Sequence, residues 1–347
     1  MITFVIPGWL DTPTGGYIYD RRIIEGMRTA GVHVDVTRLA ASFPFPDQKA
    51  LRHAARKLGS IPDGTVVVVD GLAGGAMPVN IEREATRLRL VALVHHPLAR
   101  ETGLSADKAL ALEISERQTL ESVRHVVVTS EATATLLTQD FGVASTRITV
   151  VEPGTDPAIR AAGSPDAWLE LLCVASVTPR KGHMTLMRAL GQLRDLDWHL
   201  TCVGSLHRDA ATARAVEHAV GVSQIRDRVT FTGELNDAAK LAPYYDRADV
   251  FVLPTEYEGY GMAVAEALAR GLPVISTPTG GISDLVGPDA GILVAPGDAD
   301  ALARALRQVL TNETERERLR EGAWRAGSRL PTWDHAAKQM TAALAKI

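Results

Sequence analysis

The chain has 347 residues, which predicts two domains, because a single hydrophobic core seldom grows much beyond about 250 residues. Hydrophobic residues make up 46% of it and charged residues 22%, a composition that excludes a disordered or fibrous protein. The net charge of −4, from 37 basic and 41 acidic residues, offers no broad positive field, so nucleic acid is not expected as a partner.

The first half of the chain alternates short β-branched runs, Gly or polar turns, and stretches with helical spacing. This alternation is typical of parallel strands joined by crossover helices, so the predicted class is α/β. Helices are expected between the strands, for example over residues 19–30 and 106–122. Strands are predicted at residues 2–6, 32–37, 65–69, 90–94, 125–128 and 148–151.

Residues 156–166 are rich in Pro, Gly and Ala and show neither the helical nor the strand periodicity of apolar residues. This segment predicts an interdomain linker. The expected domains are residues 1–157 and 166–329. Cys173 and Cys202 each lie in an apolar run of the second half and are interpreted as buried strand residues. Strands are predicted there at residues 169–175, 199–203, 229–232, 250–253, 274–276 and 291–294.

The end of the chain, residues 330–347, predicts a helix that packs back on the first domain. Thr332 is a candidate cap, and one helical face carries Trp333, Ala337, Met340 and Leu344. No run approaches the roughly 18 apolar residues of a transmembrane helix, and the apolar N-terminus lacks the basic lead of a signal peptide. We therefore expect a cytoplasmic protein, with peripheral membrane contact left open.

Two carboxylates, Glu258 and Glu266, bracket a glycine-rich helix start that follows the strand predicted at residues 250–253. Gly259 and Gly261 let backbone N–H groups approach a ligand, and the helix N-terminus favours an anionic oxygen. Glu266, one to two turns into the helix, is placed to accept bonds from neighbouring hydroxyls such as those of a ribose. On spacing alone, a helix with one buried, paired glutamate explains the pattern equally well.

The longer stretch over residues 254–286, PTEYEGYGMAVAEALARGLPVISTPTGGISDLV, resembles the signature of the retaining glycosyltransferases of GT-B fold (family 4, or group 1). That family includes sucrose-phosphate synthases and phosphatidylinositol mannosyltransferases. The resemblance implies that Glu266 holds the ribose of a donor nucleotide and that Glu258 contacts the donor sugar. It also implies that donor hydroxyls and phosphate meet the backbone amides of Gly259, Tyr260, Gly261 and Met262.

Two adjacent cations, Arg180 and Lys181, follow the strand predicted at residues 169–175, in the sequence Thr-Pro-Arg-Lys-Gly. Alone, such a pair is usually a solvated surface. At a strand's C-terminal end, and resembling the same family's PRKG element, it is predicted to bind the donor diphosphate and to stabilise the leaving group. Ser176 stands where family members commonly have a further Arg, which leaves the details of diphosphate binding open.

Gly15 and Gly16 form a turn between the first strand and a helix expected from about Tyr19. A double glycine is often no more than a tight turn, but the order strand, TGG, helix resembles the family, so both are predicted donor contacts. Tyr17 is a predicted acceptor contact. Two weaker donor contacts implied by the resemblance are Gly204, after a strand, and Leu235, in a turn that continues to Asn236.

His95, in the sequence His-His-Pro after the strand predicted at residues 90–94, matches the family position that faces the reacting sugar. The His95-His96 pair also suggests a metal, but no Cys, Asp or third His follows at ligand spacing, so no metal is expected. A structural histidine is the remaining alternative. Arg100 and Glu101 nearby are predicted acceptor contacts.

Taken together, the resemblance implies two Rossmann-like, doubly wound α/β domains facing a cleft, with ligands at the carboxyl ends of the strands. The expected function is a retaining hexosyltransferase that uses a nucleotide-sugar, UDP-sugar first and GDP-sugar second, without metal or other cofactor. A nucleotide-sugar epimerase, a phosphorylase and a non-catalytic nucleotide-sugar-binding protein stay open as alternatives. The acceptor, a small molecule or a lipid, and the oligomeric state are not predicted.

Overall fold

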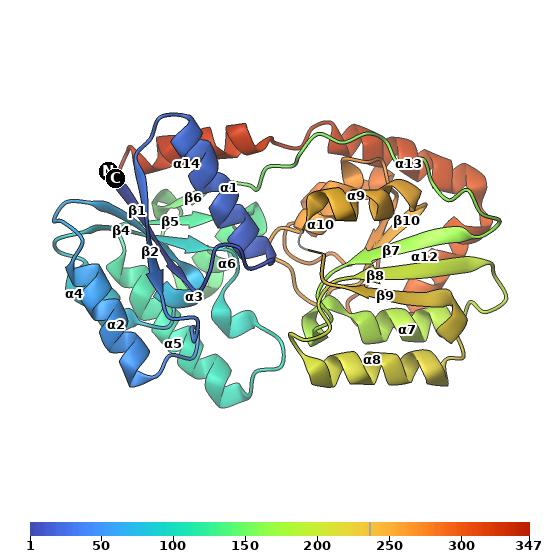
Figure 1. Ribbon diagram of the computed structural model, residues 1–347, viewed down its shortest axis with the longest axis horizontal. Coiled ribbons are helices and arrows are strands. Elements are labelled where there is room, and N and C mark those ends of the chain that lie inside the picture. Colours follow the sequence, from blue (N-terminus) through green and yellow to red (C-terminus); the bar gives the residue numbers. More distant parts are fainter. Residues whose placement is uncertain (236) are drawn as a thin grey trace. The chain divides into compact units, whose positions relative to one another are not determined.

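The computed structural model describes residues 1–235 and 237–347 of the chain, which divide into two compact units. Unit 1 comprises Met1–Gly154 together with Pro331–Ile347, and unit 2 comprises Thr155–Leu330. In each unit helices cover both faces of one sheet (Figure 1). None of the helices in the described ranges combines the length and the apolarity that crossing a membrane requires.

The sheet of unit 1 is parallel throughout, with strand order β2-β1-β3-β4-β5-β6. Its central strands are short runs of Val, Leu and Ile that are buried on both faces, as expected where helices cover both sides of a sheet. The strands are β1 (Ile2–Pro7), β2 (Val34–Leu39), β3 (Val66–Asp70), β4 (Arg89–Val94), β5 (His125–Val128) and β6 (Ile148–Val150).

Helices of unit 1 pack against one another in two groups: α2 and α5 each contact α4, while α14 contacts α1. The α-helices are α1 (Gly15–Thr29), α2 (Gln48–Gly59), α3 (Gly71–Gly74), α4 (Pro78–Glu84), α5 (Ala106–Ser122), α6 (Glu131–Phe141) and α14 (Trp333–Leu344). Two 3-10 turns complete the unit, η1 (Leu98–Arg100) and η2 (Ser145–Arg147).

The sheet of unit 2 is also parallel, with strand order β12-β11-β10-β7-β8-β9. The strands are β7 (Leu169–Val174), β8 (Trp198–Val203), β9 (Val229–Gly233), β10 (Val250–Leu253), β11 (Val274–Ser276) and β12 (Gly291–Leu293). Each of the twelve predicted strands is thus confirmed, with ends that differ by two residues at most. β-Branched and apolar runs between glycine-containing turns are a strong strand signal.

The helices of unit 2 contact one another in a series: α8 contacts α7, α7 contacts α12, α12 contacts α13, and α13 contacts α10 and α11. They are α7 (His183–Gly191), α8 (Ala210–Val222), α9 (Ala238–Arg247), α10 (Met262–Leu268), α11 (Ile282–Ala290), α12 (Ala299–Thr311) and α13 (Glu313–Gly327). The 3-10 turns are η3 (Pro179–Lys181) and η4 (Arg226–Arg228).

Helix α14 lies along α1 in unit 1 (Figure 1). Thr332 caps it through a bond that its hydroxyl accepts from the His335 N–H, and the predicted face with Trp333 and Met340 is buried. A Cβ on Gly26 of α1 would lie 2.6 Å from the Cβ of Ala337. The small residue therefore lets the two helices pack closely.

The segment predicted as a linker, residues 156–166, packs on unit 2. The Ala161 N–H donates to the Arg270 carbonyl at 2.9 Å, and the Gly163 N–H donates to the Asp246 carbonyl at 2.9 Å. Asp249 accepts a further bond from the Ser164 N–H. The unit boundary accordingly falls at residues 154 and 155, because this aperiodic stretch satisfies its backbone groups on unit 2.

The strand order reverses between β1 and β3 in unit 1, and between β7 and β10 in unit 2. Open parallel sheets bind ligands outside the carboxyl ends of strands at such reversals. The segments after β7 and β10 carry Arg180 and Glu258, and the segments at the ends of β1, β3 and β4 carry Gly16, Asp70 and His95.

Candidate functional site

In unit 2, the loop that carries Arg180 and Lys181 is held against the loop after β10. Gly182 has φ +71°, and a Cβ there would lie 1.9 Å from the Pro254 carbonyl oxygen, so only glycine fits without displacement. The Arg180 carbonyl accepts bonds from the Glu256 N–H at 2.7 Å and from the Thr255 hydroxyl at 2.9 Å. The backbone therefore fixes the two cations beside the residues that follow β10.

The side chains of Arg180, Lys181 and Glu258 form one ion cluster. The Lys181 ammonium donates to the Glu258 carboxylate, and the Arg180 guanidinium lies 3.6 Å from the other carboxylate oxygen. The three side chains are 14 to 18% exposed. Burial and the charge of Arg180 lower the pKa of Lys181, while Glu258 opposes this effect. Two sheltered cations against one carboxylate can receive an anionic oxygen.

Glu266 lies in α10 and accepts a hydrogen bond of 2.8 Å from the hydroxyl of the buried Tyr245. The Arg270 guanidinium stacks over the Tyr245 ring at 4.5 Å and donates to the Glu266 carbonyl. Burial, and then the charge of Glu266, raise the pKa of Tyr245 well above its usual value, so the phenol stays a donor. Sequence reasoning missed Tyr245, which fixes one carboxylate oxygen of Glu266.

The glycine-rich turn before α10 is supported from behind by a second glycine turn. Gly261 caps α10 with φ +104°, and the helix begins at Met262. A Cβ on Gly280 would lie 1.6 Å from the Glu258 carbonyl oxygen, and the Gly281 N–H donates to the Gly259 carbonyl at 3.0 Å. This close backbone approach holds Glu258 through Met262, including the buried Tyr260, in one conformation.

The two weaker donor predictions in unit 2 lie at the ends of β8 and β9. Gly204 touches the end of β7, since a Cβ there would lie 2.0 Å from the Ala175 carbonyl oxygen, and its N–H donates to the Gly233 carbonyl. Leu235 is half-buried against the unit 2 core, and Asn236 lies outside the described residues. Their contacts with a donor stay predictions.

In unit 1, His95 faces two buried carboxylates that sequence reasoning did not identify. Its Nε2 lies 3.2 Å from Asp20 Oδ1 and 3.7 Å from Asp70 Oδ2. Asp20 projects from α1 and is fully buried, and Asp70 ends β3 and caps α3 through the Leu72 N–H. The prediction concerned only ligand spacing after the His95-His96 pair in the sequence, and these two carboxylates reach His95 from positions distant in the chain.

The protonation states of Asp20, Asp70 and His95 depend on one another, because the three side chains lie in contact. Burial alone lowers the pKa of His95, but the hydrogen bond and charge of Asp20, and then those of Asp70, raise it to about 10. Burial and the charge of Asp70 raise the pKa of Asp20 to about 7, although His95 opposes this. His95 is therefore an imidazolium near pH 7 and suits hydrogen-bond donation better than the removal of a proton.

The glycine turn of unit 1 differs from the prediction, since α1 begins at Gly15 and not near Tyr19. Gly16 lies against His95, because a Cβ on it would meet the imidazole Cδ2 at 3.1 Å. Tyr17 donates to the Pro7 carbonyl at 2.6 Å and ties the first turn of α1 to the end of β1. The helix starts early because Thr14 is already extended and serves as its N-cap.

The predicted acceptor residues Arg100 and Glu101 lie in the loop after β4. Arg100 pairs with the exposed Asp140 at 2.6 Å, and Glu101 lies 3.2 Å from His96 Nε2. The buried Glu116 of α5 holds this loop, since its carboxylate accepts bonds from two backbone N–H groups, at residues 98 and 99. Burial raises the pKa of Glu116 to about 7.

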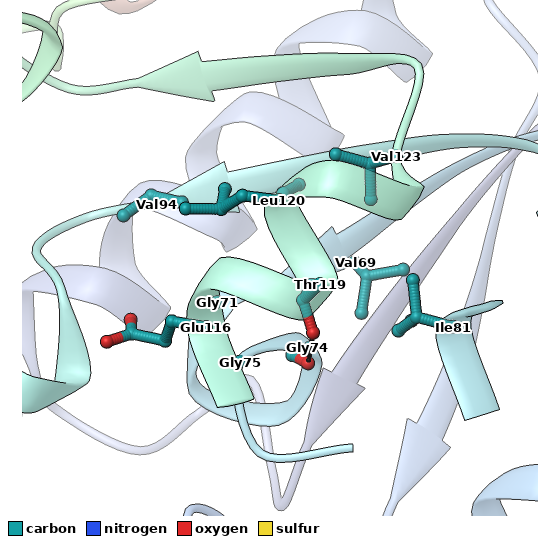
Figure 2. A pocket seen from close by; sticks show the side chains of 11 residues that line it. Val69, Gly71, Gly74, Gly75, Ile81, Val94, Glu116, Thr119, Leu120 and Val123 are labelled. Atoms are coloured by element: carbon teal, nitrogen blue, oxygen red, sulfur yellow. Dashed lines mark hydrogen bonds between the residues drawn. The ribbon is translucent and has the colours of Figure 1, made fainter. Parts of the chain in front are cut away.

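Glu116 also borders a pocket between α3, α5 and the sheet of unit 1 (Figure 2). The other lining residues are glycines and apolar side chains, except for Thr119, whose hydroxyl donates to the Gly74 carbonyl. Such a lining offers few partners for the hydroxyls and phosphates of a nucleotide-sugar. The pocket is therefore a packing space behind the loop of residues 97–101.

Two groups among the described residues present three ligand atoms within 4.8 Å of one another, Asp20-Asp70-His95 and Cys173-His183-Cys202. In the first group the histidine is itself the cation between the carboxylates. The second group combines two buried cysteines with a buried histidine and contains no carboxylate. The prediction that both cysteines are buried strand residues is confirmed, since they lie in β7 and β8.

Two family models match the chain. Residues 28–159 match a model described as Glycosyltransferase Family 4, and residues 169–312 match a model described as Glycosyl transferases group 1. Between them the two models cover most of unit 1 and most of unit 2.

Curated relatives of this chain include bacterial glycosyltransferases. An MMP alpha-(1->4)-mannosyltransferase of Mycolicibacterium hassiacum is 28% identical over an alignment of 326 residues that covers 90% of this chain and 77% of that protein. A D-inositol 3-phosphate glycosyltransferase of Xylanimonas cellulosilytica is 31% identical over an alignment of 244 residues that covers 65% of this chain and 58% of that protein. The chain thus spans only part of the length of these relatives.

Solved structures share the whole fold. Sucrose-phosphate synthase of Thermosynechococcus elongatus superposes with a TM-score of 0.84 at 23% identity and covers 100% of this chain and 99% of its own. HepE of Anabaena, solved in complex with UDP-glucose, superposes with a TM-score of 0.79 at 17% identity. The match covers 99% of this chain and 100% of the HepE chain. These likenesses confirm the predicted GT-B fold with two Rossmann-like domains.

Proposed function

We propose that this chain, which belongs to the family 4 (group 1) glycosyltransferases, transfers a sugar from a UDP-sugar with retention of its anomeric configuration. The observation that carries the proposal is the ion cluster of Arg180, Lys181 and Glu258 at the strand-order reversal of unit 2. Its two sheltered cations match a diphosphate, the one part common to all such donors.

Arg180 and Lys181 bind the donor diphosphate in this proposal. As the glycosyl bond breaks, negative charge grows on the leaving diphosphate, and two fixed cations stabilise that charge without reorganisation. The diphosphate competes with Glu258 for the cations, which releases the Glu258 carboxylate toward hydroxyls of the donor sugar. The cations take the charge-stabilising role that a bound metal has in other transferases, so no metal is required.

Glu266 accepts hydrogen bonds from the ribose hydroxyls, with Tyr245 holding one of its oxygens at 2.8 Å. The backbone amides of Gly259 to Met262 contact the sugar and phosphate. UDP is proposed as the nucleotide because HepE, a neighbour in fold, was solved with UDP-glucose. Leu235 and Gly204 complete the donor contacts of unit 2.

Unit 1 supplies the acceptor side and the remaining donor contacts. His95, kept protonated by Asp20 and Asp70, donates a hydrogen bond to the transferred sugar, close to Gly16 at the start of α1. Tyr17, Arg100 and Glu101 contact the acceptor. Each of these roles is proposed from the position of the residue in unit 1.

Retention in this proposal uses no covalent enzyme intermediate. The double displacement of retaining hydrolases needs a carboxylate nucleophile at the anomeric carbon, whereas this proposal commits Glu258 to hydroxyls of the donor sugar. The acceptor therefore attacks from the face that the departing diphosphate leaves, and the diphosphate takes up the acceptor proton. The anomeric proton of the product, observed by NMR, tests this outcome, and an inverted product would refute it.

The donor proposal is tested with UDP-, GDP-, ADP- and dTDP-sugars, by thermal stabilisation and slow donor hydrolysis. UDP-sugars should stabilise and be hydrolysed by the wild type, and Lys181→Ala and Glu266→Ala should each lose more than about 10-fold in affinity, the value of one charge-assisted bond. Lys240→Ala, which removes an exposed cation of the same unit, is the matched control. Binding that survives in both site variants would refute the assigned site.

The alternatives are less well supported. The two relatives and the sucrose-phosphate synthase named above are transferases or a synthase by name, and none of the three is called an epimerase or phosphorylase. A non-catalytic binder would bind a donor without hydrolysing it, which the same assay distinguishes. Screening acceptors in the presence of the stabilising donor then identifies the second substrate.

A further inference from the structure

We propose that Cys173, His183 and Cys202 form a binding site for a soft, thiophilic metal ion of the zinc class. The three side chains lie beneath the loop that carries Arg180 and Lys181, in a part of unit 2 that the proposed transfer does not use. Their ligand atoms lie within 4.8 Å of one another. The site stands on its own geometry, whether or not the chain transfers sugars.

The fold brings the two cysteines together through strand register. β7 and β8 pair in parallel with Cys173 opposite Cys202, and paired residues of neighbouring strands project on the same face of a sheet. His183 is the first residue of α7, which starts directly after Gly182. The register and the start of one helix thus place two thiols and an imidazole in one spot.

The distances fit a tetrahedral thiophilic ion. Bonds of about 2.3 Å to sulfur and about 2.05 Å to nitrogen separate two ligands of such an ion by about 3.5 Å. The Cys173 Sγ and the His183 Nε2 are 3.7 Å apart. Closing a hydrogen-bonded thiol and imidazole onto a metal therefore requires only a small movement of the side chains.

Burial makes the cluster unusual for three polar groups. Cys173, His183 and Cys202 are 0%, 1% and 2% exposed. The Nδ1 of His183 has no hydrogen-bond partner within residues 1–235 and 237–347, and its Nε2 faces sulfur. Buried imidazoles usually bond to oxygen, so a ring directed at a thiol fits a ligand better than a structural hydrogen bond.

Charge selects the class of ion. Two thiolates and a neutral imidazole carry a charge of −2, and a divalent ion makes the group neutral, which a buried site favours. Sulfur ligands favour zinc-class ions over hard cations such as Mg²⁺, which prefer oxygen. Three protein ligands leave the fourth position of the ion to a water or another small ligand.

A cadmium titration of the full chain tests the site, because a cadmium–thiolate bond has its own ultraviolet charge-transfer band. The chain has two cysteines, so any such band must come from Cys173 and Cys202. We expect one Cd²⁺ per chain with the intensity of two thiolates, and Zn²⁺ should displace it. Cys173→Ser and Cys202→Ser should each remove about half of the band and lower the affinity.

His183→Asn should weaken Cd²⁺ and Zn²⁺ binding by more than about 10-fold, since even an outer-shell partner of a metal ligand is worth that much. His199→Asn, on the same strand as Cys202 but stacked on Trp168, should bind as the wild type does. The comparison of these two histidine variants tests the site even if the cysteine variants fold poorly. Circular dichroism reports whether each variant is folded.

Three results would overturn the site. The first is a folded wild type that takes up no Cd²⁺ or shows no thiolate band. The second is Zn²⁺ binding, measured by competition with a chromophoric chelator, that persists unchanged in the serine variants and so belongs to a surface site. The third is equal affinity in His183→Asn and His199→Asn, which would show that His183 is not a ligand and so overturn the three-residue site.

Discussion

Replacing Asp70 by Asn should flatten the dependence of unit 1 stability on pH. The substitution keeps the shape of the side chain and an oxygen for the Leu72 N–H, but it removes one of the two carboxylates that face His95. His95 then holds its proton less tightly. Asp20 loses the like charge that helps to raise its own pKa.

The magnitude follows from the pKa of His95, which rises from its ordinary 6.5 to about 10 in the folded chain. A raised pKa means that the stabilisation is fully present below pH 6.5 and is lost as the pH rises toward 10. Between about pH 6.5 and about pH 9 the wild type should lose on the order of 3 kcal/mol from this group. Asp70→Asn should lose about half as much, because one of two carboxylates is gone.

The assay must report on unit 1 alone. The chain is equilibrated in urea at each pH and then labelled with deuterium in a brief pulse at one fixed pH, and mass spectrometry follows peptides of β3 and β4. Asp140→Asn, which neutralises an exposed carboxylate paired with Arg100, is the control and should keep the wild-type slope. An Asp70→Asn slope as steep as that of the wild type would refute the reasoning.

Two further predictions concern unit 2. Tyr245→Phe should raise the donor KM about 10-fold with little change in kcat, because Glu266 loses a hydrogen bond to a charged group; Tyr244→Phe is the control, and equal KM values in the two variants would contradict the role. Gly182→Ala should destabilise unit 2 by more than about 2 kcal/mol, since φ is +71° and the new methyl would lie 1.9 Å from the Pro254 oxygen. Urea unfolding measures the latter, and wild-type stability would contradict it.

Local sequence patterns are enough to predict the twelve strands, the fold class and the residues at the strand ends of unit 2. Parallel strands that are buried on both faces have short, continuous apolar sequences, such as those of Val66–Asp70 and Val250–Leu253. Arg180, Lys181 and Glu258 follow two such runs directly. Their closeness depends on the strand order, in which β7 and β10 are neighbours although β8 and β9 lie between them in the chain.

The partners of those residues depend on tertiary packing. Asp20 reaches His95 from α1, 75 positions away in the chain, and Tyr245 reaches Glu266 from the preceding helix. Neither carries a local signal, since each looks like an ordinary residue of an amphipathic helix. The register of β7 and β8 likewise brings Cys173 to Cys202. Such contacts depend on how helices pack and how strands align, and these follow from long-range burial that local periodicity does not record.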